Sequence, residues 1–549
     1  MQLTPLAETV LKKRYLARNY RDELLETPAD LFRRVAHAIA EADRLFDARA
    51  EVGKTARKFE DVMASFAFLP NSPCLMHAGR PMGQLAACFV LPVEDSLESI
   101  FQSLKDAAVI HQTAGGTGFS FSRLRPGGDT ILPAFGAAGG PIPFIRLFDT
   151  ATHIIDRHRI RPGANMGVLH VSHPDIEPFI RVKQEPGQLM NFNLSVAVDD
   201  HFLAQVRSGG DYPLIHPRTG VIIDTRPAAE LLRLMAECAW KTGDPGLLFI
   251  DRVNRANPTP GLGRLEATNP CGEQPLLPYE SCTLGSINLT RMIDSRGVNF
   301  DRLGRTVATA VHFLDNVIEV NRYPLRRIEE WSRANRKIGL GVMGFADMLI
   351  MLNIPYQSEE AVRLADSIMA HIQQCAEAAS ADLAEKRSNF PAFDHSIFPG
   401  RGVKYRRNAT LTTVAPTGSI SLIAGVSSGI EPVFAFQIRR RVVDTVYDDV
   451  HPLYERYRQE GRKTPPEIFQ TAWDVDPEWH LEIQAAFQAH TDNAVSKTVN
   501  VPESADVDSI YRLFLKAADM NIKGITVYRD QSLSNQILSL CSTSREDCS

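Results

Sequence analysis

A short stretch with two cysteines, residues 269–282 (NPCGEQPLLPYESC), carries residue types that could do chemistry. Asn269 and Glu273 each lie two residues from Cys271, and Cys282 follows eleven residues after Cys271. The prolines and the glycine of this segment disfavour a helix, so we expect the thiol in an irregular loop. A thiol nucleophile or radical centre, an orienting amide and a carboxylate base would together form an active site. A core loop with a capping Asn269 and an inert thiol stays an alternative.

Three other patterns resemble ligand sites. Gly53-Lys54-Thr55 lacks the first glycine of a P-loop, because position 48 is alanine, and it is interpreted as a solvated helix end. Residues 115–118 (GGTG) could let a backbone approach a phosphate, or could form a plain turn. His170 and His173 would need two more ligands to hold zinc, and the sequence offers none nearby, so a structural role is favoured. We therefore expect no metal site formed by the chain itself.

The elements that must position these residues alternate between helical and extended patterns. Residues 1–65 are expected to be helical, with Thr27 as an N-cap ahead of Pro28. From about 66 to 300, short apolar runs alternate with Gly- and Pro-rich turns and helical patterns. A helix that leads into the apolar strand GITVY is expected over 508–529. Strands that alternate with helices predict an α/β fold.

Composition excludes several classes of protein. The chain has 549 residues with 44% hydrophobic and 23% charged residues, as in ordinary globular enzymes, and its net charge of −5 predicts no nucleic-acid surface. We see no apolar run long enough to span a membrane and no signal peptide at the N-terminus. Eight cysteines are too sparse for a secreted disulfide scaffold. A reducing cytoplasm is therefore the expected location.

The amino-acid sequence of the active-site candidate, residues 269–282, resembles that of the large chain of ribonucleotide reductases. Further matching segments, in family order, are NSPCLMHAG (71–79), ACFVLPVEDSLESIF (87–101), GGTGFSFSRLRPGG (115–128), GANMG (163–167), HPDIEPFI (173–180), NFNLSVAV (191–198), RRNATLTTVAPTGSISLIAGVSSGIEP (406–432) and KGITVYRD (523–530). The loop and the APTGSIS segment resemble class II, the adenosylcobalamin-dependent branch. The resemblance covers residues 10–530.

The resemblance implies a ten-stranded α/β barrel with a central finger loop that carries the radical cysteine. It divides the chain into an N-terminal helical region (1–70), the barrel domain (71–530) and a short C-terminal tail (531–549). Family tails often carry a cysteine pair that re-reduces the active site. Cys541 and Cys548 are either a shortened version of that pair or incidental.

The resemblance also assigns chemical roles. Cys271 would become a thiyl radical that abstracts the ribose 3′ hydrogen, Glu273 would take the 3′ hydroxyl proton, and Asn269 would hold the sugar hydroxyls. The 2′ hydroxyl would leave as water. Cys88 and Cys282 would supply two electrons and close a disulfide in each turnover, which a thioredoxin-like protein is expected to reduce.

Substrate and effector contacts are assigned by matching positions. The substrate-binding candidates are Ser72, Ala87, Gly116, Pro416, Thr417, Gly418, Ser419 and Ile420. The last five would offer backbone N–H groups and hydroxyls to the phosphates, with an ordinary turn as the alternative. Asp95, Ser96 and Arg125 match positions that contact a dNTP effector. The segment 157–166 should link effector to substrate, and Pro162 departs from the family's usual Gly-Gly sequence there.

Alternatives within and beyond this family remain. The leading hypothesis is a cobalamin-dependent homodimer that reduces ribonucleotides, with diphosphates favoured by analogy. A class I large chain would need a separate radical subunit and a pair of adjacent tyrosines, but Tyr511 and Tyr528 are solitary. A non-catalytic nucleotide-binding paralogue is the third possibility, and the presence of all the expected cysteines and Glu273 argues against it. No activity-regulating domain is expected ahead of the family core.

Overall fold

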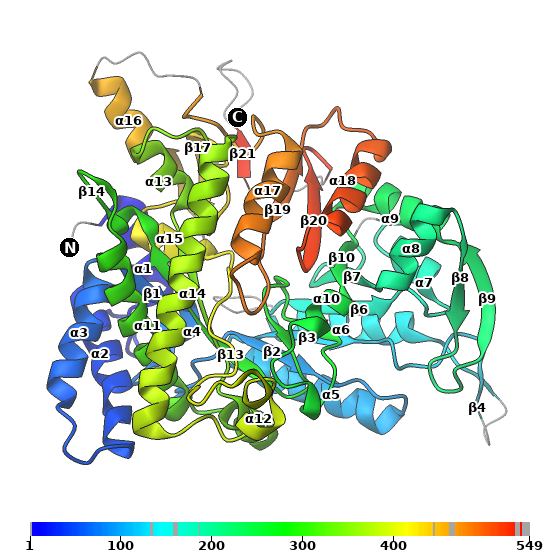
Figure 1. Cartoon of the computed structure of the whole chain (residues 1–549), viewed down its shortest axis with the longest axis horizontal. Coiled ribbons are helices and arrows are strands. Elements are labelled where there is room, and N and C mark those ends of the chain that lie inside the picture. The colour runs from blue at the N-terminus through cyan, green and yellow to red at the C-terminus, as the bar shows by residue number, and fades with distance from the viewer. Residues whose placement is uncertain are drawn as a thin grey trace.

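The first helices lie at one end of the molecule. The computed structural model describes residues 3–131, 136–156, 163–185, 187–442, 445–460, 467–532 and 538–540. The N-terminal helices are α1 (Pro5–Arg14), α2 (Pro28–Ala40) and α3 (Val52–Ala64) (Figure 1). The Thr27 hydroxyl accepts from the Asp30 N–H, and the Asp30 carboxylate accepts from the Thr27 N–H. The predicted N-cap is therefore confirmed, in the form of a capping box.

A sheet of ten strands forms the centre of the molecule. These strands are β1 (Phe68–Pro70), β2 (Cys88–Leu91), β3 (Gly116–Ser120), β6 (Asn165–His170), β7 (Phe192–Val198), β10 (Gly246–Phe249), β13 (Ser281–Asn288), β16 (Ile338–Met343), β19 (Thr498–Val501) and β20 (Gly524–Arg529). The order is β1-β13-β2-β3-β6-β7-β10-β20-β19. β16 also pairs with β13, along the edge opposite to β1. This confirms the predicted α/β fold.

The strands fall into two groups of opposite direction. β2, β3, β6, β7 and β10 run parallel to one another, and β13 and β20 join them antiparallel at either side. The described strands do not form a continuous closed ladder. Instead, single bridges link Leu340 to Thr412 and Val414 to Val495, between β16 and the residues just before β19. The two ends of the sheet are thus brought together by isolated backbone pairs.

Helices alternate with these strands along the chain. The longer ones are α5 (Leu97–Gln112), α6 (Pro141–Asp156), α8 (Asp200–Ser208), α9 (Ala228–Thr242), α11 (Phe300–Val320), α12 (Arg326–Asn335), α14 (Glu359–Arg387), α16 (Pro452–Gln459), α17 (Pro477–Gln488) and α18 (Val507–Asp519). The shorter ones are α4 (Ser72–His77), α7 (Ile176–Arg181), α10 (Ile250–Arg255), α13 (Phe345–Met351) and α15 (Gly418–Ala424). No helix in the described ranges is both long and apolar enough to cross a membrane.

The shorter strands form small sheets that are separate from the central one. They are β4 (Thr130–Ile131), β5 (Gly136–Ala137), β8 (Asp211–Ile215), β9 (Ile222–Pro227), β11 (Ala267–Thr268), β12 (Pro275–Leu276), β14 (Ile293–Asp294), β15 (Gly297–Val298), β17 (Gln437–Val442), β18 (Thr445–Val450) and β21 (Leu538–Leu540). The β8–β9 hairpin lies at the end of the molecule opposite α2 and α3 (Figure 1).

Alternation along β2 separates an outer core from an inner one. Phe89 and Leu91 pack with the residues of α5 and α9 in one apolar cluster. Cys88 and Val90 belong to a different cluster, which also contains Ala267 of β11. Successive side chains of a strand point to opposite faces, so the β11–β12 hairpin must lie on the inner face of the sheet.

Glycines in β3 make room for that hairpin. A Cβ atom at Gly118 would lie 1.7 Å from the carbonyl oxygen of Thr268, and one at Gly116 would lie 2.9 Å from the Pro270 ring. Only glycine allows the two backbones to approach this closely. Gly116 and Gly118 lie within a strand, so interpreting 115–118 as a plain turn is wrong for these two positions. Their use in the structure is close backbone packing.

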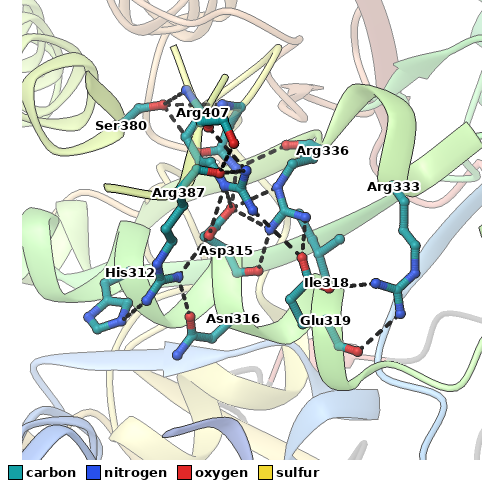
Figure 2. Close-up of polar contacts among 12 residues, drawn as sticks. His312, Asp315, Asn316, Ile318, Glu319, Arg333, Arg336, Ser380, Arg387 and Arg407 are labelled. Atoms are coloured by element: carbon teal, nitrogen blue, oxygen red, sulfur yellow. Dashed lines mark hydrogen bonds and ion pairs between the residues drawn. The ribbon is translucent and has the colours of Figure 1, made fainter. Parts of the chain in front are cut away.

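A buried group of arginines and carboxylates joins the N-terminal helices to the sheet domain. Asp315 of α11 accepts from Arg336 at 2.7 Å and from Arg387 at 3.0 Å, and Arg407 lies 3.4 Å away (Figure 2). Arg387 also donates to Asp43, in the turn that follows α2, at 2.6 Å. Burying charges is costly unless each is paired, and here each arginine named has a carboxylate partner.

Candidate active site

The tip of the β11–β12 hairpin exposes Cys271. Asn269 closes the tip, because its N–H donates to the Gln274 carbonyl at 3.1 Å and its side-chain oxygen accepts from the Gln274 N–H at 2.9 Å. Gly272 has a φ of +81°, a left-handed conformation that favours glycine. Cys271 is exposed and lines a cavity of about 720 Å³. The proline- and glycine-rich spacing thus produces a tight loop that presents a thiol.

One strand and two other segments hold this loop in place. Asn193 of β7 donates to the Pro270 carbonyl at 2.8 Å. The Glu273 carbonyl accepts from the Thr413 hydroxyl at 2.8 Å and from the Ala494 N–H at 2.9 Å. Sequence reasoning gave no role to these supporting residues. Asn193 and Thr413 lie within the matching segments NFNLSVAV and ATLTTVAPTG, which is the signal that could have found them.

Cys88 and Cys282 lie directly opposite each other on antiparallel strands. They are register partners in the β2–β13 pair, and both are buried. Opposed residues in such a pair have Cα atoms about 4.5–5.5 Å apart, which lies within the span that a disulfide bridges. The fold thus places together two cysteines that are far apart in the sequence.

The loop residues contact this cysteine pair. The Asn269 amide donates to the Cys88 sulfur at 3.1 Å, and the Cys88 thiol lies 3.9 Å from Glu273 Oε1. Asn269 and Glu273 are both buried. An amide, a carboxylate and the candidate dithiol pair therefore meet beside the tip that carries Cys271.

A buried ion pair lies next to Cys282. Lys337 Nζ donates to Glu280 Oε2 at 2.6 Å, and these side chains are only 2% and 1% exposed. In the parallel β13–β16 pair Thr283 lies opposite Ile338. Cys282 and Lys337 each come one residue before these partners, so they lie on neighbouring chain segments. Burial raises the pKa of Cys282 well above its usual value, Lys337 opposes this rise, and Glu280 adds to it. Cys282 is thus held as a protonated thiol, and Lys337 is a neighbour that sequence reasoning missed.

The substrate-phosphate candidates lie at the start of α15. Pro416 lines the cavity that contains Cys271. Thr417 has a φ of +56°, and its hydroxyl accepts from the Gly429 N–H at 2.7 Å. Gly418 is exposed and Ser419 half-buried, whereas the Ile420 side chain belongs to the core. Residues 416 and 417 lead directly into α15, and only Pro416 of the five candidates is among the described lining of the cavity.

The other substrate candidates divide into two groups. Ala87 accepts from the Gly116 N–H at 2.9 Å, and Gly116 lies against Pro270 of the loop. Ser72 is the first residue of α4, and its hydroxyl lies 2.8 Å from the Tyr15 hydroxyl. Ala87 and Gly116 therefore lie beside the loop, whereas the hydrogen-bonding partner of Ser72 is in the N-terminal region.

The effector candidates come together at the start of α5. Arg125 and Asp95 form a bidentate ion pair, with Arg125 Nε 2.9 and 3.0 Å from the two carboxylate oxygens. Ser96 caps α5 by accepting from the Ser99 N–H at 3.1 Å. Residues 157–162 of the predicted linking segment, including Pro162, lie outside the described residues, as do Cys541 and Cys548.

Comparison with known families covers nearly the whole chain. The model for the ribonucleotide reductase all-alpha domain matches residues 1–83, and the model for the ribonucleotide reductase barrel domain matches residues 86–405 and 401–528. This chain belongs to the ribonucleotide reductase family. The family resemblance read from its motifs is therefore confirmed, and the helical N-terminal region and the ten-stranded sheet fall within the matched domains.

Similar members of this family carry a more specific name. A vitamin B12-dependent ribonucleoside-diphosphate reductase of Mycobacterium tuberculosis is 48% identical over 563 residues, which cover 98% of this chain and 81% of that relative. One of the same name from Thermoplasma acidophilum is 42% identical over 98% of this chain and 80% of the relative. A ribonucleoside-diphosphate reductase subunit alpha of Chlamydia muridarum is 27% identical over 92% of this chain and 57% of the relative.

Proposed function

We propose that this chain reduces ribonucleoside diphosphates to 2′-deoxyribonucleotides by a thiyl-radical mechanism with adenosylcobalamin as its cofactor. One observation carries this proposal: Cys271 stands exposed at a loop tip in a large cavity, beside Glu273 and the opposed Cys88–Cys282 pair. The names of the relatives at 42–48% identity support the choice of cofactor and of diphosphate substrates.

Each residue has a defined task in this mechanism. When bound, adenosylcobalamin would supply the radical chemistry that leaves Cys271 as a sulfur radical. The Cys271 sulfur radical takes the 3′ hydrogen of the ribose, Glu273 holds the 3′ hydroxyl proton, and the 2′ hydroxyl leaves as water. Of the two thiol hydrogens of Cys88 and Cys282, one leaves with the 2′ hydroxyl as water and the other is added at C2′, and the two sulfurs join as a disulfide. Cys271 then returns the abstracted hydrogen atom to C3′, which restores its sulfur radical. The dithiol pair is buried, whereas the radical carrier Cys271 is exposed to the cavity, where a bound substrate would cover it.

The cavity next to Cys271 fits a large planar cofactor. Strands β7, β10 and β20 contribute Leu194, Leu247, Leu248 and Tyr528 to its lining, and the segment after α15 contributes Val433 and Phe434. Apolar surface of this extent with a few polar groups suits a macrocycle that carries amide side chains. These residues would hold the cofactor near the Cys271 sulfur.

We extend the proposal to partners and regulation. A dNTP effector would bind near Asp95, Ser96 and Arg125, where Arg125 suits a triphosphate once a ligand competes for it. α5 packs against α6, and Leu97, Phe101 and Ile154 on these helices are exposed, which supports a homodimer through this face. A thioredoxin-like dithiol would reduce the disulfide. The cytoplasmic location and the division into 1–70, 71–530 and 531–549 stay predictions.

The test is an assay with one purified chain. It contains cytidine diphosphate, dithiothreitol, adenosylcobalamin in the dark and a dNTP, and it measures deoxycytidine diphosphate. We expect product without any second subunit, and none when the cofactor is omitted. Product that requires an added radical subunit would favour the class I alternative. Nucleotide binding without product under either condition would favour the non-catalytic paralogue.

A further inference from the structure

A second cavity, about 350 Å³ in volume, lies at the carboxyl ends of the parallel strands. His170 is the last residue of β6 and Ile250 follows β10 directly, and both line this strand-end cavity. The Cys271 cavity is lined instead by residues near the start of the same strands, Met166 of β6 and Gly246 of β10. No described residue lines both cavities. Because ligands of α/β sheets bind outside the carboxyl ends of parallel strands, this position favours a binding site.

His170 offers a hydrogen-bond donor to the strand-end cavity. Its Nδ1 accepts from the Ser172 backbone N–H at 3.2 Å, and since that group can only donate, the ring proton lies on Nε2. Burial lowers the pKa of His170, so the ring is neutral at pH 7. Nε2 lies 3.8 Å from Asp199 Oδ2, too far for a hydrogen bond, and that oxygen already accepts from the Tyr212 hydroxyl at 2.6 Å. The His170 side chain is 30% exposed and Nε2 is not buried, so its N–H is available to a ligand.

Two further donors line the same cavity. Ser122 Oγ accepts from the His170 backbone N–H at 2.9 Å and from the Ser120 hydroxyl at 3.0 Å, so its own hydrogen can point to a ligand. Arg264 Nη2 lies 3.6 Å from Asp251 Oδ1, which is an ion pair without a hydrogen bond, and the Arg264 side chain is 71% exposed. An imidazole N–H, a hydroxyl and a guanidinium therefore border one cavity with donors to spare.

The two other histidines of this cavity are engaged by the protein. His173 Nε2 lies 2.8 Å from the Leu124 carbonyl oxygen, and His216 Nε2 lies 3.3 Å from Asp129. The Nδ1 atom of each ring accepts from a backbone N–H. No group of three or more histidine, cysteine or acidic side chains placed to hold a metal ion occurs among the described residues. The cavity thus presents hydrogen-bond donors rather than a set of metal ligands.

The charges that line the cavity favour an anion. Glu266 is the acidic residue of its described lining, and both of its carboxylate oxygens accept from Arg123, at 3.1 and 2.7 Å. Arg264 then adds positive charge, while Asp199 and Asp251 lie near the donors but do not line the cavity. A phosphate group has three terminal oxygens that accept hydrogen bonds, which matches three separate donors better than the two oxygens of a carboxylate.

We propose that the strand-end cavity binds a phosphate monoester. Its three terminal oxygens accept from His170 Nε2, Ser122 Oγ and the Arg264 guanidinium. Its organic part lies against the apolar side chains of the lining, which are those of Ala197, Ile215, Pro217, Ile250 and Leu265. The site goes beyond the proposed function, since none of the substrate or effector candidates is among its described lining residues.

The test is equilibrium dialysis of tritiated deoxyadenosine monophosphate against the full chain, with cytidine diphosphate and thymidine triphosphate present to fill the substrate and effector sites. Arg264→Gln removes the charge and should weaken binding at least tenfold, and Arg264→Lys should restore most of it. His170→Asn keeps an oxygen that can accept from the Ser172 N–H but removes the Nε2 donor, so it should bind about tenfold more weakly. Arg296→Gln is the matched control: Arg296 has a similarly long 3.9 Å contact, with Asp294, and does not line the cavity, so its affinity should be unchanged.

Competition by unlabelled inorganic phosphate tests the organic part of the ligand. Phosphate lacks a group for the apolar side chains, so it should compete at least tenfold more weakly than the monoester. Equal affinity of the two would overturn the proposal in favour of a site for a free anion. The proposal is also overturned if the wild type does not bind the monoester, or if Arg264→Gln, shown to be folded by circular dichroism, binds it as tightly as the wild type. Because the variants assign the site, these outcomes leave the proposed function untouched.

Discussion

At the scale of single residues, the opposed positions of Cys88 and Cys282 carry the argument for a redox pair. The pairing depends on the β2–β13 register and would be lost if either strand slipped by one residue, because the side chain would then point to the opposite face. Cys271 is different, since it is exposed at the loop tip and faces the cavity rather than a partner strand. These two environments suit a radical carrier and a dithiol, respectively.

Replacement of Cys88 by serine should stop repeated turnover. Cys88→Ser removes one of the two thiols, so no disulfide can form with Cys282, and product with dithiothreitol should fall by at least 100-fold. Nucleotide and cobalamin binding should be nearly unchanged, because serine is close in size. Cys271→Ser should abolish product altogether. Cys375→Ser, in α14 and away from the site, is the control and should remain active. Robust multiple turnover by Cys88→Ser would contradict the assigned pair.

At the scale of elements, the position of the β11–β12 hairpin depends on β3. The hairpin lies on the inner face of the sheet only because β3 has no side chains at Gly116 and Gly118. Asn193 and Thr413 then hold its two sides by hydrogen bonds to backbone carbonyls. The position of the Cys271 sulfur is therefore set by strands that come both before and after it in the sequence.

A single methyl group on β3 should displace the hairpin. Gly118→Ala would place Cβ 1.7 Å from the Thr268 carbonyl oxygen, so one of the two backbones must move by more than an ångström. Misplacement of this size should lower deoxynucleotide formation by about 100-fold. Gly53→Ala is the control, since no atom lies within 4 Å of its added Cβ, and activity should be retained. Gly118→Ala with more than half of the wild-type rate would show that the loop position is not set by β3.

At the scale of the whole molecule, the buried arginine cluster connects regions that are far apart in the chain. Asp43 lies within the matched all-alpha domain, and Asp315, Arg387 and Arg336 lie within the matched barrel domain. Arg336 is adjacent to Lys337, whose ion pair with Glu280 lies beside Cys282. The cluster therefore links the N-terminal region, through Asp43, to residues beside the redox pair.

Removal of the charge at Asp315 should destabilise the protein. Arg336, Arg387 and Arg407 lower the pKa of Asp315 against the effect of burial. Asp315→Asn would leave these three buried cations with only Asp43 and Glu319 as carboxylate partners, so positive charge would be in excess. A loss of about 3–5 kcal/mol in the free energy of unfolding is expected from urea denaturation at pH 7. Asp382→Asn, on the exposed face of α14, should change it by less than about 0.5 kcal/mol.

The same variant carries a pH dependence. The folded-state pKa of Asp315 is lowered, so its stabilising contribution is fully present above the unfolded value of about 3.9 and disappears as pH falls through the folded value. The difference in unfolding free energy between wild type and Asp315→Asn should therefore narrow below about pH 4. A constant difference from pH 7 to pH 3 would mean that the aspartate acts through packing rather than charge.

The sequence by itself determined the local structure and the identity of the reactive groups. The Thr27 cap, the alternation of strands and helices, and the Asn269–Cys271–Glu273 spacing depend on neighbours within a few residues, so they can be read directly. The matching segments then indicated the family. The tertiary structure alone decided which distant residues meet: Cys88 with Cys282, Lys337 beside that pair, and Gly118 against Thr268. Strand register and side-chain packing join residues that are 55 to 194 positions apart, and no local pattern encodes those contacts.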